Sequence, residues 1–100
     1  MITLTNENFD DFINQDNSIV QFSATWCGPC KSLSITLANI KTDAQIGKLD
    51  IDDAIKIAAK FGIRSVPTLV FFKGGKEVDR TMGAKPAQKI QEFIDKNKGQ

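Results

Sequence analysis

The hydrophobic and polar positions of this chain change period several times, which predicts strands interleaved with helices. Short apolar runs of strand length are separated by segments in which apolar residues recur at i, i+3 and i+4, as on one face of a helix. The predicted strands span about residues 2–4, 18–23, 46–51, 66–72 and 77–82. The predicted helices cover about residues 9–13, 30–41 and 54–61, and a last helix starts at 86.

The order of these elements indicates an α/β architecture with one mixed sheet. The first three strands are joined by helical segments, which favours parallel pairing, whereas Gly74 and Gly75 join the last two strands as an antiparallel hairpin. The run 66–72 is apolar almost throughout, as in a strand covered on both faces, and the more polar 77–82 suits a sheet edge. We expect about five strands flanked on both faces by four helices, in a single domain over residues 1–100.

Composition narrows the possible functions. With a net charge of +1, the chain shows no bias toward nucleic acid or an acidic membrane surface, and no apolar run reaches membrane-spanning length. No apolar segment with a basic flank opens the sequence, so we expect a cytoplasmic protein. The chain has no histidine, which excludes serine–histidine and cysteine–histidine hydrolases.

The only two cysteines, Cys27 and Cys30, lie where the strand 18–23 gives way to a helix. The free N–H groups of a first helical turn carry partial positive charge, which stabilises a thiolate and lowers the pKa of a cysteine placed there. Pro29 suits this turn because its missing N–H costs nothing, and Gly28 leaves space beside Cys27. The pattern favours a dithiol that cycles to a disulfide.

The cysteine pair has two other interpretations, and the neighbouring Trp26 has one. Half of a zinc site would need further ligands, and with no other cysteine or histidine only a dimer sharing two pairs could supply them, so we expect no metal. A purely structural disulfide would close so short a loop that it stabilises little, and a reducing cytosol would break it. Trp26 could belong to the core, but its place directly before Cys27 favours an apolar contact surface for partners.

The stretch Trp26–Cys30 resembles the active site of the thioredoxin family. The resemblance continues through Lys48–Asp52, Gly62–Thr68, the turn Lys73–Lys76 and Gly83–Ala84, in the order of the family and over nearly the whole chain. It implies the thioredoxin fold and a small protein-disulfide reductase. Electrons would come from NADPH through a thioredoxin reductase, or from a ferredoxin-linked equivalent, with no cofactor bound to this chain.

The resemblance also assigns the two cysteines. Cys27 would attack an oxidised protein substrate and form a mixed disulfide, and Cys30 would resolve it. We expect a monomer that binds neither nucleic acid nor membrane. Two other classes stay open: an oxidase or isomerase of the same fold, and a non-enzymatic binding subunit. The Gly28–Pro29 pair favours a reductant.

Further site residues follow from the same resemblance. Sequence alone favours an ordinary trans Pro67 at a strand start, whereas the family implies a cis Val66–Pro67 bond beside the cysteines. The Val66 backbone would pair with an extended substrate segment, and Gly83 and Ala84 would line the same groove. Lys48 is expected below the cysteines.

The sequence departs from the family at informative positions. Gln21 stands where the family has a buried acid that is thought to relay a proton from the second thiol. The proline that kinks the long helix is replaced by Ile35, so we expect that helix to run without a sharp bend. We also expect Asp50 to pair with Lys48, since the two lie on one strand face, and Asp52 or Asp53 to cap the third helix.

Overall fold

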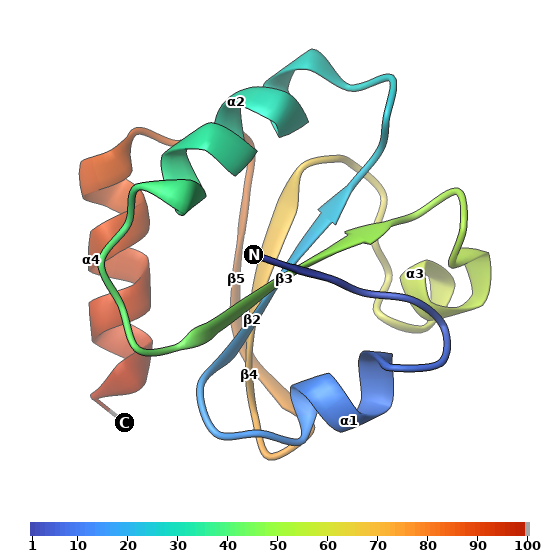
Figure 1. Cartoon of the computed structure of the whole chain (residues 1–100), viewed down its shortest axis with the longest axis horizontal. Coiled ribbons are helices and arrows are strands. Elements are labelled where there is room, and N and C mark those ends of the chain that lie inside the picture. Colours follow the sequence, from blue (N-terminus) through green and yellow to red (C-terminus); the bar gives the residue numbers. More distant parts are fainter. Residues whose placement is uncertain (100) are drawn as a thin grey trace.

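The computed structural model describes residues 1–99, so the last residue of the predicted domain lies outside it. Figure 1 shows a central sheet between two layers of helices. The strands are β1 (Ile2–Thr3), β2 (Ser18–Ser23), β3 (Gln45–Asp50), β4 (Thr68–Lys73) and β5 (Lys76–Met82). The helices are α1 (Phe9–Ile13), α2 (Gly28–Ala38), α3 (Ile55–Lys60) and α4 (Ala87–Lys98).

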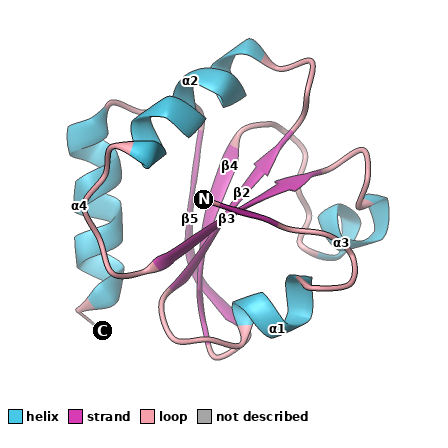
Figure 2. Ribbon diagram, viewed as in Figure 1, coloured by secondary structure: helices cyan, strands magenta, loops and turns pink. Residues whose placement is uncertain are grey.

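The five strands form one mixed sheet in the order β1-β3-β2-β4-β5, drawn in magenta in Figure 2. β3 pairs in parallel with both β1 and β2. β4 runs antiparallel to β2 and to β5. The predicted parallel first half, the C-terminal hairpin and the edge position of β5 are therefore confirmed.

Two hydrophobic layers hold the helices to the sheet. On one face, α1 and the loop before α3 pack against β2 and β4 through a cluster that includes Phe9, Phe22 and Phe72. On the opposite face, α2 and α4 cover the same strands through a cluster that includes Leu33, Phe71 and Ile90. Helices thus lie on both faces, as the sequence predicted.

The central strand β2 shows how this arrangement supports the site. Successive side chains point to opposite faces of a sheet. Val20 and Phe22 enter the layer under α1, whereas Ile19 belongs to the layer under α2. Gln21 therefore points toward α2 and is completely buried there. A polar side chain in this position must find partners on that helix.

Some element boundaries differ from the prediction. α2 starts at Gly28 and ends at Ala38, three residues short of the predicted end, where the Asn39 side chain donates to the Ile35 carbonyl at 2.9 Å. The helix is continuous through Ile35, and the unbent axis there stays a prediction. α3 starts after Ala54 with no side-chain cap, so the predicted cap by Asp52 or Asp53 is wrong.

A polar cluster joins α4 to the edge strand β5. The buried Asn97 donates from its Nδ2 to the Asp79 carboxylate at 3.0 Å and to the Phe93 carbonyl at 2.8 Å. The Lys96 ammonium lies 2.9 Å from the same carboxylate. Partial burial raises the pKa of Asp79, but the hydrogen bonds from Asn97 and Lys96 outweigh it and leave that pKa below its ordinary value.

We expect Asp79→Asn to destabilise the protein at neutral pH by about 1 kcal/mol, the usual net contribution of such hydrogen bonds. A carboxylate with a lowered pKa stabilises the fold above its unfolded pKa of about 3.9, and this contribution is lost as pH falls through the folded pKa. Urea melts of both proteins at decreasing pH should show that the difference between their free energies of unfolding disappears in acid. A difference that persists unchanged in acid would contradict a stabilising role for the Asp79 charge.

Candidate active site

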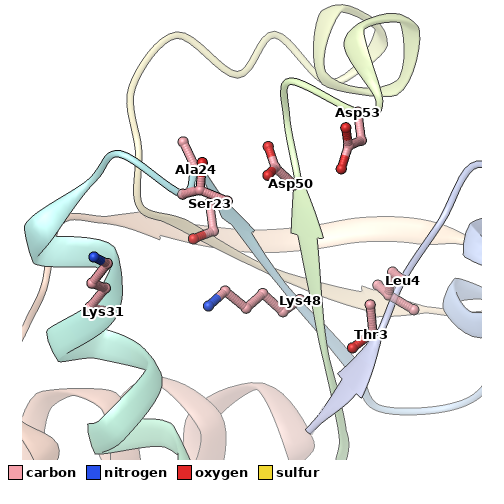
Figure 3. A pocket seen from close by; sticks show the side chains of 9 residues that line it. Thr3, Leu4, Ser23, Ala24, Lys31, Lys48, Asp50 and Asp53 are labelled. Atoms are coloured by element: carbon pink, nitrogen blue, oxygen red, sulfur yellow. The ribbon is translucent and has the colours of Figure 1, made fainter.

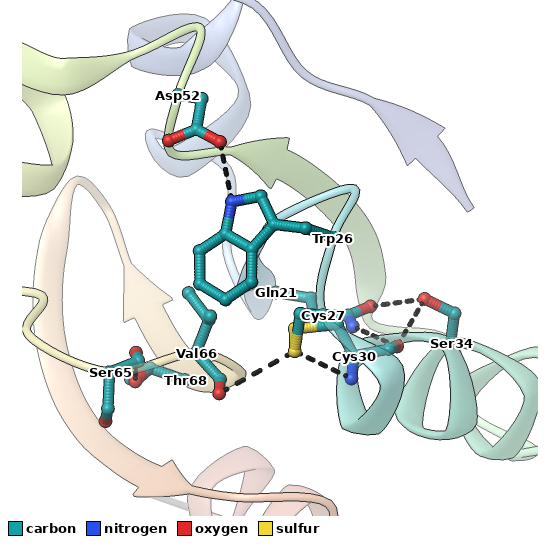
Figure 4. Close-up of a disulfide and its surroundings, with 9 residues drawn as sticks. All are labelled: Gln21, Trp26, Cys27, Cys30, Ser34, Asp52, Ser65, Val66 and Thr68. Atoms are coloured by element: carbon teal, nitrogen blue, oxygen red, sulfur yellow. Dashed lines mark hydrogen bonds between the residues drawn. A yellow bond between two sulfur atoms is a disulfide. The ribbon is translucent and has the colours of Figure 1, made fainter.

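The two cysteines lie at the start of α2 and are joined by a disulfide (Figure 4). Cys27 is the N-cap residue, in extended backbone conformation, and Cys30 belongs to the first turn. The backbone N–H of Cys30 donates to the Cys27 sulfur at 3.1 Å. The helix therefore directs an amide proton at the sulfur that would carry the charge of a thiolate, which is the arrangement that lowers a cysteine pKa.

The surroundings of the disulfide differ on its outer and inner sides. Trp26, directly before it, is 68% exposed, whereas Cys27 is 5% and Cys30 1% exposed. A Cβ on Gly28 would meet no atom within 4 Å, so the space beside Cys27 is open. Pro29 occupies the first turn of α2, as expected. Cys27 is therefore the more solvent-accessible of the two cysteines.

The loop before β4 lies against Cys27. The Val66–Pro67 peptide bond is cis, and the Val66 carbonyl oxygen lies 3.8 Å from the Cys27 sulfur. Gly83 donates its backbone N–H to the Pro67 carbonyl at 2.9 Å and has a φ of +90°, which favours glycine. The segment Gly83–Ala84 is thereby held beside Pro67, where the sequence resemblance placed it.

A neutral hydrogen-bond network lies behind the disulfide. Gln21 is 0% exposed and donates from Nε2 to the Cys30 carbonyl at 3.0 Å. The Ser34 hydroxyl lies 3.1 Å from Gln21 Oε1 and 3.0 Å from the Cys30 carbonyl, so its one proton is shared between two acceptors. Sequence reasoning missed Ser34, although its place one helical turn after Cys30 was the available signal.

Lys48 extends toward the helix of the cysteines but, in the described part of the chain, lacks the ion-pair partner expected for it. It is the register partner of Gln21 on β3, and its side chain extends toward α2 in Figure 3. Within residues 1–99, no ion pair joins it to Asp50, so the expected pairing is wrong. The Asp50 carboxylate instead accepts the backbone N–H of Asp52 at 2.8 Å, which turns it toward the loop after β3.

Asp52 has a role that the sequence did not reveal. Its carboxylate accepts a hydrogen bond from Trp26 Nε1 at 2.9 Å and fixes the orientation of the exposed indole (Figure 4). The two residues come from loops that follow the adjacent parallel strands β2 and β3. No local pattern signals this contact, since it depends on the pairing of those strands.

Two further findings concern other kinds of site. Within residues 1–99, no cluster of three or more histidine, cysteine or acidic side chains is arranged to bind a metal ion. Over the same range, no helix has both the length and the apolar character needed to cross a membrane.

Comparison with known proteins agrees with this geometry. The Thioredoxin family model matches residues 1–96. A thioredoxin from Staphylococcus saprophyticus is 42% identical over 97% of both chains, and one from Staphylococcus aureus is 38% identical with the same coverage. A solved structure of a mutant thioredoxin from Halobacterium salinarum superposes with a TM-score of 0.91 at 30% identity, covering 97% of this chain and 89% of the other.

A cysteine pair at the start of a helix, on a mixed sheet with helices on both faces, defines a thiol-disulfide oxidoreductase. The chain belongs to the thioredoxin family. Its activity is that of a protein-disulfide reductase, which exchanges a dithiol for the disulfide of a substrate. Proteins of this family act without a bound cofactor.

Proposed function

We propose that Cys27 is the attacking residue and Cys30 the resolving residue of this reductase. The observation that carries this assignment is the hydrogen bond from the Cys30 N–H to the Cys27 sulfur at the start of α2. This bond and the partial positive charge of the first turn stabilise a thiolate on Cys27. The inner position of Cys30 suits a thiol that reacts only with its neighbour.

Reduction proceeds in two exchanges. The Cys27 thiolate attacks one sulfur of the substrate disulfide, forms a mixed disulfide and releases the other sulfur as a thiolate, which takes a proton. Cys30 loses its proton to solvent and attacks the Cys27 sulfur, which releases the second substrate sulfur as a thiolate that takes up a proton. The substrate gains two electrons, and Cys27 and Cys30 end as the disulfide seen in the structure.

The substrate segment would lie in a groove formed by Trp26, Val66, Pro67, Gly83 and Ala84. The edge of this groove offers backbone groups of Val66 for pairing with an extended chain, as in strand addition. Trp26 supplies an exposed apolar face held by Asp52. Gly83 lacks a side chain where a substrate backbone would approach, and nothing would touch a Cβ built on it.

The oxidised protein must be reduced again before another cycle. We infer that a thioredoxin reductase supplies the electrons from NADPH, or that a ferredoxin-linked reductase does so, because this chain presents a disulfide and family members bind no cofactor. We infer a monomeric protein of the cytoplasm, a compartment in which a reducing dithiol is maintained. The shared sheet supports one domain over residues 1–100.

Alkylation of the reduced protein tests the assignment of the cysteines. With one equivalent of iodoacetamide near neutral pH, we expect Cys27 to be modified far ahead of Cys30, because thiolate character and access coincide at Cys27. Peptide mapping by mass spectrometry reads out the site. Preferential labelling of Cys30 would reverse the proposed roles.

Two alternatives are separated by other measurements. An oxidase or isomerase of the same fold would show a reduction potential well above that of a reductant, so equilibration with glutathione buffers distinguishes it. A binding subunit would keep its biological function after Cys27 and Cys30 are both changed to serine. Loss of function in that double variant supports the redox role.

A further inference from the structure

A pocket lies on the β1 side of the cysteine pair, and none of the residues assigned to the proposed substrate groove lines it. Its volume is about 400 Å³, within the range of small-molecule sites. Ser23 and Lys31 line it from the side of β2 and α2, and Lys48, Asp50 and Asp53 line it from β3 and the following loop. Figure 3 shows these side chains around one space.

Ser23 gives the first sign that this pocket binds a ligand. Its side chain is on the same sheet face as Gln21, two residues along β2, and the residue is 1% exposed. Its Oγ is buried without a hydrogen-bond partner. A buried hydroxyl is almost always satisfied, so an unpaired one that lines a pocket is available to a polar group from outside the chain.

The charged groups of the pocket are divided between two ends. In Figure 3 the Lys48 ammonium group extends toward α2 below the Ser23 hydroxyl, and Lys31 lies on α2 itself, whereas the carboxylates of Asp50 and Asp53 lie toward the loop that leads to α3. Within residues 1–99, no ion pair joins either lysine to either aspartate. The pocket therefore presents two ammonium groups and two carboxylates that do not neutralise each other by direct contact.

We propose that this pocket binds a small zwitterion, with an anionic group at Lys31, Lys48 and Ser23 and an ammonium group at Asp50 and Asp53. A simple anion would gain from the lysines but would be repelled by the aspartates, and a simple cation would meet the reverse. A molecule with both charges satisfies both ends and the Ser23 hydroxyl. The site does not depend on the proposed roles of Cys27 and Cys30, because neither cysteine lines it.

The test is a ¹H–¹⁵N NMR titration of the oxidised protein with γ-aminobutyrate, butyrate and butylammonium. These probes share one carbon chain and differ only in their charges. We expect saturable shifts of the amides of Ser23, Lys48 and Asp53 with γ-aminobutyrate, and binding about fivefold weaker for each singly charged probe. Equal affinity for all three probes, or no saturable shift at these amides, would refute the proposal and leave a pocket that holds water only.

Two variants place the ligand within the pocket. Ser23→Ala removes a hydroxyl that has no partner, so the fold should be retained while affinity for γ-aminobutyrate falls about fivefold to tenfold. Lys48→Gln should weaken binding, whereas Lys41→Gln, an exposed lysine outside the pocket, should leave it unchanged. Unchanged affinity in Ser23→Ala, or an equal loss in Lys41→Gln, would show that the ligand does not occupy this site.

Discussion

Cys30→Ser should turn the protein from a catalyst into a trap for its substrates. Cys27 can still form the mixed disulfide, but no neighbouring thiol remains to break it. Release then depends on thiols from solution, which lack the high effective concentration of a group held in place. We expect multiple-turnover reduction of a disulfide substrate to fall by about a thousandfold or more, with one covalent adduct per molecule.

Cys27→Ser is the matched control. It removes the attacking sulfur and leaves Cys30 1% exposed in the native fold, so we expect neither turnover nor a stable adduct. Non-reducing electrophoresis and mass spectrometry of both variants after incubation with an oxidised protein read out the result. Adducts on Cys30 in the Cys27→Ser protein, at the rate seen for Cys27 in Cys30→Ser, would contradict the assigned order of attack.

The second large effect is expected at Gln21, where an acid would be buried behind the disulfide. Gln21 is completely buried and links the Cys30 carbonyl to Ser34 by hydrogen bonds. In Gln21→Asp, burial would raise the pKa of the new carboxyl by as much as about 3–5 units in the folded state. Each unit corresponds to about 1.4 kcal/mol between the protonation states.

The sign of the pH dependence follows from these pKa values. With a raised pKa the folded state binds more protons than the unfolded state, so stability falls as pH rises. The loss begins above the unfolded pKa of about 4 and levels off above the folded pKa, near pH 8 for a large shift. We expect Gln21→Asp to lose about one to a few kcal/mol relative to the original protein over this interval.

Gln21→Asn is the control for this change, since it has the same length as aspartate but no charge. Urea melts of the three proteins between about pH 4 and pH 8 give the loss of unfolding free energy in each variant relative to the original protein. This loss should grow with pH in Gln21→Asp and stay constant in Gln21→Asn. The same carboxylate could accept the Cys30 proton, so the mixed disulfide should resolve faster in Gln21→Asp. A loss in Gln21→Asp that does not change with pH would show that a carboxyl group at position 21 does not have the raised pKa of a buried acid.

Local sequence patterns were sufficient to predict most of the fold. The strand predicted at residues 18–23 has the same limits as β2, and Gly62, at a φ of +64°, ends α3 as a left-handed cap. The crossover helices and the Gly74–Gly75 turn gave the pairing directions correctly. These features depend on residues close together in the sequence, whose periodicity and turn chemistry are read directly.

The contacts that shape the site were harder to predict, because they join residues far apart in the chain. Asp52 was expected to cap a helix but binds the Trp26 indole, and Asp50 was expected to pair with Lys48 but accepts a bond from its own loop. Both outcomes depend on the register of β2 against β3 and on side-chain directions at the ends of those strands. The composition and the spacing of residues carry no information on that register or on those side-chain directions.

The most direct test of the account is the reduction of insulin disulfides by catalytic amounts of this protein, supplied with NADPH and a thioredoxin reductase. We expect rapid precipitation of the insulin B chain and consumption of one NADPH per disulfide reduced, with both signals lost in Cys27→Ser. Reduction no faster than with the reductase and NADPH alone, or equal activity in Cys27→Ser, would contradict a protein-disulfide reductase that works through Cys27 and Cys30.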